Sequence, residues 1–131
     1  ELFIITSKIL KKSIKNLICV ASMATVIAAS FCTVSATTVT YYLLNNGSNP
    51  SQTNYLGNVN AVVGETPTCE GSATGVDIRI YGGNTYVGLI RPRMNESTKS
   101  YIQNINNCRT TTTLVSSSFG SWSKGNITTA P

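Results

Sequence analysis

The stretch VDIRIYGGNTYVGLI, residues 76–90, constrains the fold more than any other part of the sequence. Its first six residues alternate between two sets of side chains, and this two-residue period is typical of a strand with one face on a core. The apolar set is Val76, Ile78 and Ile80. The opposite set is Asp77, Arg79 and Tyr81. Gly-Gly-Asn follows, and these residues accept the positive φ of a tight turn. The stretch therefore predicts an antiparallel hairpin of residues 76–81 and 85–90, with the apolar set facing the core.

Further strands are predicted on both sides of this hairpin. TVTYYLL, residues 38–44, is rich in β-branched and aromatic residues and contains no breaker. Residues 45–54 contain Asn, Gly, Pro and Ser and predict a loop, and a strand is expected around residues 59–63. Residues 109–122, rich in Thr and Ser, predict one or two late strands, and the end of the chain is expected to form a turn and a short edge or tail.

Residues 97–108 are the one segment beyond the leader where the pattern favours a helix. Tyr101, Ile105 and Cys108 have the spacing i, i+4, i+7 that places side chains on one side of a helix. Several Asn residues in the same segment are poor helix formers. We expect one or two helical turns here.

The beginning of the sequence has the order of a secretory signal peptide. Four lysines between residues 8 and 15 precede an uncharged apolar run from Leu17 to Cys32, and Val34-Ser35-Ala36 ends it with small or β-branched residues. We expect a helical signal segment over residues 1–36, with cleavage after Ala36. The status of residues 1–7 is left open, because the first Met is Met23, inside the apolar run.

Two alternatives, a transmembrane helix and a lipoprotein signal, fit this segment less well than a cleaved signal peptide. The 20 uncharged residues from Leu17 to Ala36 have about the length that crosses a bilayer. However, the run is rich in weakly hydrophobic Ala, Ser and Thr, and no charged residue follows it closely. A lipid-bearing Cys needs a small residue before it, whereas Phe31 precedes Cys32. The interpretation is therefore a protein secreted from a bacterial cell, whose contact with a membrane is limited to the signal peptide before its removal.

Cleavage after Ala36 leaves residues 37–131, which have the length of a single domain. A polar domain of this size buries a small core and commonly needs a cross-link. It retains two cysteines, and in an exported protein such a pair predicts a Cys69–Cys108 disulfide. The predicted fold is all-β: a small antiparallel β-sandwich or curled sheet with one disulfide.

The composition of the chain argues against catalysis and against cofactors. The sequence contains no His, which removes His-based acid–base catalysis and His-ligated zinc. After cleavage the chain would contain four acids, and they neither cluster as calcium ligands do nor form a recognisable catalytic pair. We expect that the protein is not an enzyme and that it binds neither a metal nor a cofactor.

The charge pattern and the hairpin together lead to a functional hypothesis. Much of the formal charge of +5 comes from the leader, and the only basic cluster beyond it, Arg91-Pro92-Arg93, is interpreted as a solvated turn, so nucleic acid is not an expected partner. Asp77, Arg79 and Tyr81 form the candidate binding surface, because an exposed Tyr beside Arg suits recognition of a protein or a carbohydrate. We expect a secreted binding or surface-interaction module whose partner is a cell-surface protein or carbohydrate. The alternative is a secreted bacteriocin-like antimicrobial or toxin effector.

Overall fold

The computed structural model describes residues 36–130, and all regular secondary structure in this range is β-strand. Residues 1–35, which include nearly all of the predicted leader and its helix, lie outside the described range. The strands are β1 (Thr38–Leu44), β2 (Ser51–Gly64), β3 (Thr68–Glu70), β4 (Gly75–Gly82), β5 (Thr85–Ile90), β6 (Lys99–Val115) and β7 (Trp122–Ala130). Within the described residues, no helix is long and apolar enough to span a membrane. The all-β prediction is confirmed for this part of the chain.

The seven strands form one antiparallel sheet, in which six follow the order β1-β7-β2-β6-β4-β5 and β3 pairs with β7 outside this order. One edge of β7 pairs with β1 along its length, and the other edge is shared by the end of β2 and by β3. β4 lies between β6 and β5. The first and last strands of the described chain are therefore neighbours.

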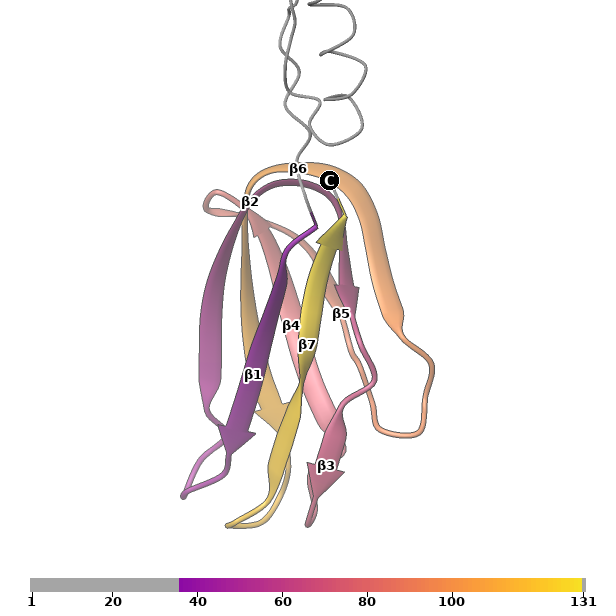
Figure 1. Ribbon diagram of the computed structural model, residues 1–131. Coiled ribbons are helices and arrows are strands. Elements are labelled where there is room, and N and C mark those ends of the chain that lie inside the picture. Colours follow the sequence, from indigo (N-terminus) through magenta and orange to yellow (C-terminus); the bar gives the residue numbers. More distant parts are fainter. Residues whose placement is uncertain (1–35, 131) are drawn as a thin grey trace, which may run out of the picture. The chain divides into compact units, whose positions relative to one another are not determined.

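The two long strands, β2 and β6, make the sheet curl. Residues 51–57 of β2 pair with residues 108–113 of β6, whereas residues 59–64 pair with residues 99–105. The later part of β6 also pairs with β4, and the end of β2 also pairs with β7. Figure 1 shows both long strands arching over one end of the domain. We call residues 51–57 and 108–115 with β4 and β5 the β4 half, and we call the remaining strand residues the β7 half.

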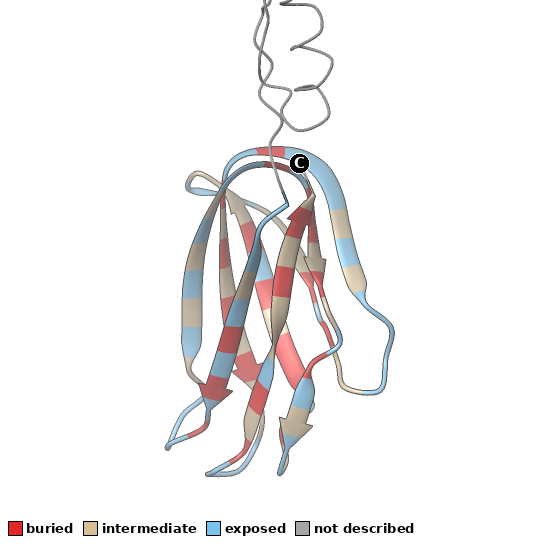
Figure 2. Cartoon of the chain, in the orientation of Figure 1, coloured by how far each residue is buried: buried red, intermediate tan, exposed pale blue. Residues whose placement is uncertain are grey.

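The core lies between these two halves. Figure 2 shows buried residues alternating with exposed ones along most strands. Val76, Ile78 and Ile80 are fully buried, as their alternation predicted. They belong to one apolar cluster with Tyr41, Leu43 and Ile127 of the β7 half. The fold is thus held by apolar burial between two parts of the same sheet.

The predicted hairpin is confirmed as β4 and β5. Gly82 pairs with Thr85, so only two residues form the turn between them. Gly83, the first of the two, has a φ of 63°, which a residue without a Cβ adopts at no steric cost.

The predicted helical turns in residues 97–108 are wrong, because this segment is the first half of β6. Ile105 and Cys108 are both buried although they are three positions apart, a spacing that places side chains on opposite faces of a regular strand. Asn107 has a φ of 54° and interrupts the regular alternation, so that the buried positions change from odd to even numbers. A β-bulge has this effect on a strand, and here it imitates the spacing of a helix.

The other differences concern strands that the sequence marks weakly. β2 begins at Ser51, inside the predicted loop, because its first half pairs with the Thr-rich part of β6. The segment expected to form a turn and a short edge or tail is β7, which is paired on both edges and is therefore not at the edge of the sheet. Its burial alternates through Ser123, Ile127 and Thr129, and only one of these three is apolar. Polar residues at inward positions hide a strand from a search for apolar alternation.

The threonine run of β6 places two hydroxyl groups in the core. Thr110 and Thr112 are fully buried, whereas Thr111 and Thr113 face outward. The Oγ1 atoms of Thr110 and Thr112 have no hydrogen-bond partner in the described part of the chain. A buried hydroxyl without a partner is destabilising.

We expect Thr112→Val to raise the free energy of unfolding by about 1 kcal/mol, because it removes a buried, unpaired hydroxyl and keeps the shape of the side chain. The matched control is Thr111→Val on the outer face, for which we expect a change within about 0.5 kcal/mol. Equilibrium unfolding in urea measures both. Equal effects of the two substitutions would show that the buried hydroxyl is not the cause.

The predicted Cys69–Cys108 disulfide is wrong, since both cysteines are free thiols in the structure. Cys69 Sγ lies 2.9 Å from Ser123 Oγ, and this Oγ donates a hydrogen bond to the carbonyl of Gly75, at the start of β4. Cys108 is paired in register with Gly82, at the end of β4. Seven steps along a strand span about 23 Å, whereas the Cα atoms of a disulfide lie about 4.4–6.8 Å apart.

We expect the two thiols to differ in reactivity in the folded protein. Cys108 is buried, and this burial raises the pKa of its thiol, so that it forms less of the reactive thiolate at a given pH. Cys69 is half-buried and reaches the surface. Alkylation at neutral pH, followed by mass spectrometry of the peptides, should label Cys69 first and Cys108 only after unfolding. Two cysteines that become reactive only after reduction would contradict the structure.

Candidate functional site: the outer face of the β4 half

The three residues predicted as a binding surface lie together on the outer face of β4. Their side chains alternate with those of Val76, Ile78 and Ile80, which point into the core. Each is opposite a residue of β6, and directly opposed residues of antiparallel strands share a face. The pairs are Asp77 with Thr113, Arg79 with Thr111, and Tyr81 with Arg109.

The same register extends this face over four strands. In β2, Ser51, Thr53 and Tyr55 lie opposite Thr113, Thr111 and Arg109. In β5, Leu89 lies opposite Arg79 and Tyr86 lies opposite Tyr81. We call the outward side chains of residues 51–55, 77–81, 86–91 and 109–113 the outer face. It is the surface of a paired sheet, so its side chains are held by a rigid backbone.

One end of the outer face is aromatic. The rings of Tyr81 and Tyr86 meet edge to face, with centroids 5.7 Å apart and an interplanar angle of 71°. The guanidinium carbon of Arg109 lies 4.1 Å from the centre of the Tyr81 ring, which is a cation–π contact. Tyr55 and Tyr86 remain 80% and 53% exposed. These two rings are therefore available to a ligand, whereas Tyr81 is partly covered by its neighbours.

The other end of the outer face is an ion-pair cluster around Asp77. Its Oδ1 lies 3.0 Å from Arg93 Nη2 and 3.6 Å from Arg91 Nε. Arg93 Nη1 also donates a hydrogen bond of 2.7 Å to the carbonyl of Val76. The backbone supports this arrangement, because Val76 N–H donates to the carbonyl of the buried Pro92. The loop after β5 is thus fixed against β4.

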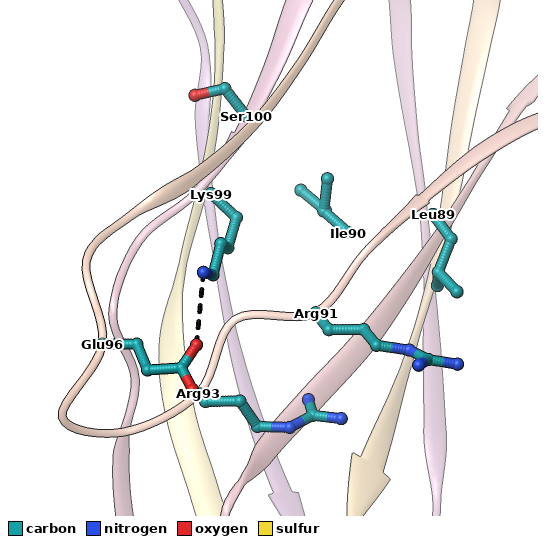
Figure 3. A pocket seen from close by; sticks show the side chains of 7 residues that line it. All are labelled: Leu89, Ile90, Arg91, Arg93, Glu96, Lys99 and Ser100. Carbon is teal, nitrogen blue, oxygen red and sulfur yellow. Dashed lines mark ion pairs between the residues drawn. The ribbon is translucent and has the colours of Figure 1, made fainter.

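An open groove of about 710 Å³ adjoins this end of the outer face. It is lined by Leu89, Ile90, Arg91, Arg93, Glu96, Lys99 and Ser100. Figure 3 shows the ion pair between Lys99 and Glu96, whose Nζ and Oε1 atoms are 3.2 Å apart, and shows Arg91 and Arg93 extending away from Lys99. Three cations and one carboxylate line the groove, and Arg91 and Arg93 also share the carboxylate of Asp77, so these five groups carry a net charge of +1.

The segment directly after β5 differs from its prediction as a solvated turn. Arg91-Pro92-Arg93 is not a solvated turn, because Pro92 is buried and the Arg93 side chain is only 24% exposed and pairs with Asp77. Asp77 is likewise half-buried by this pairing. Arg79 is exposed, and no hydrogen bond or ion pair of its side chain is found within residues 36–130. The part that these residues take in binding stays a prediction.

Sequence reasoning did not associate Arg109 or Tyr55 with this surface. Both lie on strands far from the hairpin in the chain, and their place follows from the pairing of β2 with β6 and of β6 with β4. Tyr86 had a local signal, since it belongs to the predicted hairpin and faces Tyr81 across it.

The described residues give no sign of a metal centre, because no three His, Cys, Asp or Glu side chains gather in residues 36–130 as ligands would. No protein-family model matches the chain, and no curated protein matches it either. The functional interpretation therefore rests on the geometry and charge of the outer face.

We expect Asp77 and Arg79 to differ in their effect on stability. Asp77→Ala should lower the free energy of unfolding by about 1 kcal/mol, because it leaves Arg93 without its partner in a partly solvated position. Arg79→Ala should change it by less than about 0.5 kcal/mol, since the side chain is exposed. Urea unfolding compares the two. A larger loss for Arg79→Ala than for Asp77→Ala would contradict this assignment of contacts.

Proposed function

We propose that this chain is a secreted binding module, without catalytic chemistry of its own, that attaches to a component of a cell surface through the outer face. The basic, apolar and small-residue order of residues 1–36 supports export by a bacterial type of signal peptide. The part that follows the leader supplies a small sheet domain with a rigid, solvent-exposed surface.

One observation carries the proposal: all four arginines of the sequence belong to the outer face or line the groove beside it. Three of the six tyrosines, Tyr55, Tyr81 and Tyr86, lie on the same face. Arg and Tyr are the residues that binding surfaces concentrate, because each combines a large contact area with directional polar groups. Chance would spread them over both sides of the domain.

The composition of the chain supports binding over catalysis. The absence of His from the sequence removes the commonest general base. The only carboxylate on the outer face, Asp77, is already paired with two arginines. Its ion pairs hold it in place and leave it with no evident part in proton transfer.

We expect fluorescently labelled protein to bind to intact cells or isolated cell walls, and Arg79→Ala to weaken this binding at least about tenfold, the loss expected for a charge-assisted hydrogen bond. Tyr86→Ala should also weaken it, because this exposed ring offers contact area. Flow cytometry or pull-down with washed walls measures the bound fraction.

The matched control is Lys124→Ala, which removes an exposed cation from β7, on the other half of the sheet. Its binding should equal that of the unchanged protein. Growth of the same cells is followed in parallel, because growth inhibition that survives Arg79→Ala would point to the antimicrobial alternative. If Lys124→Ala and Arg79→Ala lose binding equally, the outer face is not the binding surface.

A further inference from the structure

Three arginines form a diagonal row on the outer face, one in β6, one in β4 and one directly after the end of β5. Arg109 of β6 is level with Tyr81 of β4, and Arg79 lies two residues before Tyr81. On the other side of β4, Arg79 is opposite Leu89, so Arg91, two residues further on, is level with Asp77. Diagonal neighbours of this kind are about 7–8 Å apart. The row therefore runs Arg109, Arg79, Arg91.

Most of the positive charge in this row is not compensated. Arg109 contacts the Tyr81 ring, and neither Arg109 nor Arg79 forms an ion pair in the described part of the chain. Arg91 shares the carboxylate of Asp77 with Arg93 and keeps 62% of its side chain exposed. A row of guanidinium groups on a rigid surface, two of them without an ion pair, attracts a ligand with repeated negative charges, since a guanidinium group can take a carboxylate, phosphate or sulfate through two parallel hydrogen bonds.

The surroundings of the row indicate what else this ligand contains. The exposed rings of Tyr55 and Tyr86 lie at its Arg109 end, and an electron-rich ring face attracts the positive C–H side of a sugar ring. Outward hydroxyl groups of Ser51, Thr53 and Thr111 accompany the row across the sheet and can donate to or accept from other hydroxyls. Sugars and acidic groups in one extended molecule satisfy all of these features.

Two other classes of polyanion fit less well. A protein partner concentrates its strongest contacts near the centre of the interface, whereas the exposed rings of Tyr55 and Tyr86 lie at one end of the outer face, and Arg79 and threonine hydroxyls occupy its middle. A nucleic acid gains much of its affinity from bases stacked on open aromatic rings. The two open rings, Tyr55 and Tyr86, do not lie side by side as successive bases require, because Arg109 and the Tyr81 ring, which Arg109 covers at 4.1 Å, lie between them.

We infer that the outer face binds an acidic polysaccharide as an extended chain. Its acidic groups lie along Arg109, Arg79 and Arg91, and its sugar rings pack on Tyr55 and Tyr86. The basic groove at the Arg91 end continues the binding path. This inference rests on the proposed function and specifies the chemical class of the cell-surface component.

The test measures binding of labelled oligosaccharides of equal length by fluorescence anisotropy, using a uronic-acid oligosaccharide, a sulfated one and a neutral dextran. We expect both acidic probes to bind, with an affinity that falls as salt rises, and the neutral probe not to bind. Arg79→Ala should weaken binding at least about tenfold, and Arg79→Lys should weaken it less, because a lysine keeps the charge but loses the fork. Lys124→Ala should stay within about twofold, since it removes a charge of the same sign from the other half of the sheet.

Two further probes decide between classes of ligand. Polyglutamate and a single-stranded oligonucleotide carry negative charge without acidic sugars in a polysaccharide chain, and equal or tighter binding of either would overturn the inference. Failure of every acidic saccharide would overturn it as well. If cells still bind the protein in an Arg79-dependent way after that failure, the proposed function stands and only the ligand class is wrong. If the protein binds acidic saccharides but not cells, the proposed function fails by itself.

Discussion

The rest of the structure depends on the change of face in the middle of β6. Before Asn107 the buried side chain is Ile105, and after it the buried side chains start with Cys108. The backbone N–H of Asn107 donates to the side chain of Asn58, and Gly57, which pairs with Cys108, has a φ of 74°. Both long strands are therefore irregular at the same level. The sheet curls at this level, so that β2 and β6 each contribute one part to the β4 half and one part to the β7 half. The core forms between the two halves.

The parts of the fold that sequence could predict are those whose signal is local. The hairpin needed only an alternation and a turn, and both lie within fifteen residues. The bulge of β6 misled the prediction because an irregular strand can place Ile105 and Cys108 at the spacing of a helix. In place of β7 the sequence predicts only a turn and a short edge or tail, because Ser123 and Thr129 occupy inward positions. A buried serine or threonine in a sheet depends on neighbours that are distant in the chain, and a single sequence does not show them.

The residues of the candidate surface also differ in whether their place has a local signal in the sequence. Alternation predicted that Asp77, Arg79 and Tyr81 share one face, whereas Arg109 and Tyr55 join it only through the pairings of β6. The disulfide was inferred from the number of cysteines, and this number carries no information on distance. The two cysteines lie at opposite ends of β4: Cys69 is near Gly75, and Cys108 is paired with Gly82.

The pairing of β1 with β7 has a consequence for the rate of folding. Thr37 N–H donates to Thr129 Oγ1 across a separation of 92 residues, and Thr38 and Thr128 face each other in register. Contacts this distant in the chain require a large loop to close before they contribute any stability. Domains dominated by such contacts fold in milliseconds to seconds, far more slowly than helical bundles. Until β7 arrives, β1 and β3 lack a partner strand in the described sheet, and the last four residues of β2 are paired with β6 on one edge only. This interval is when the chain is most exposed to association with other chains.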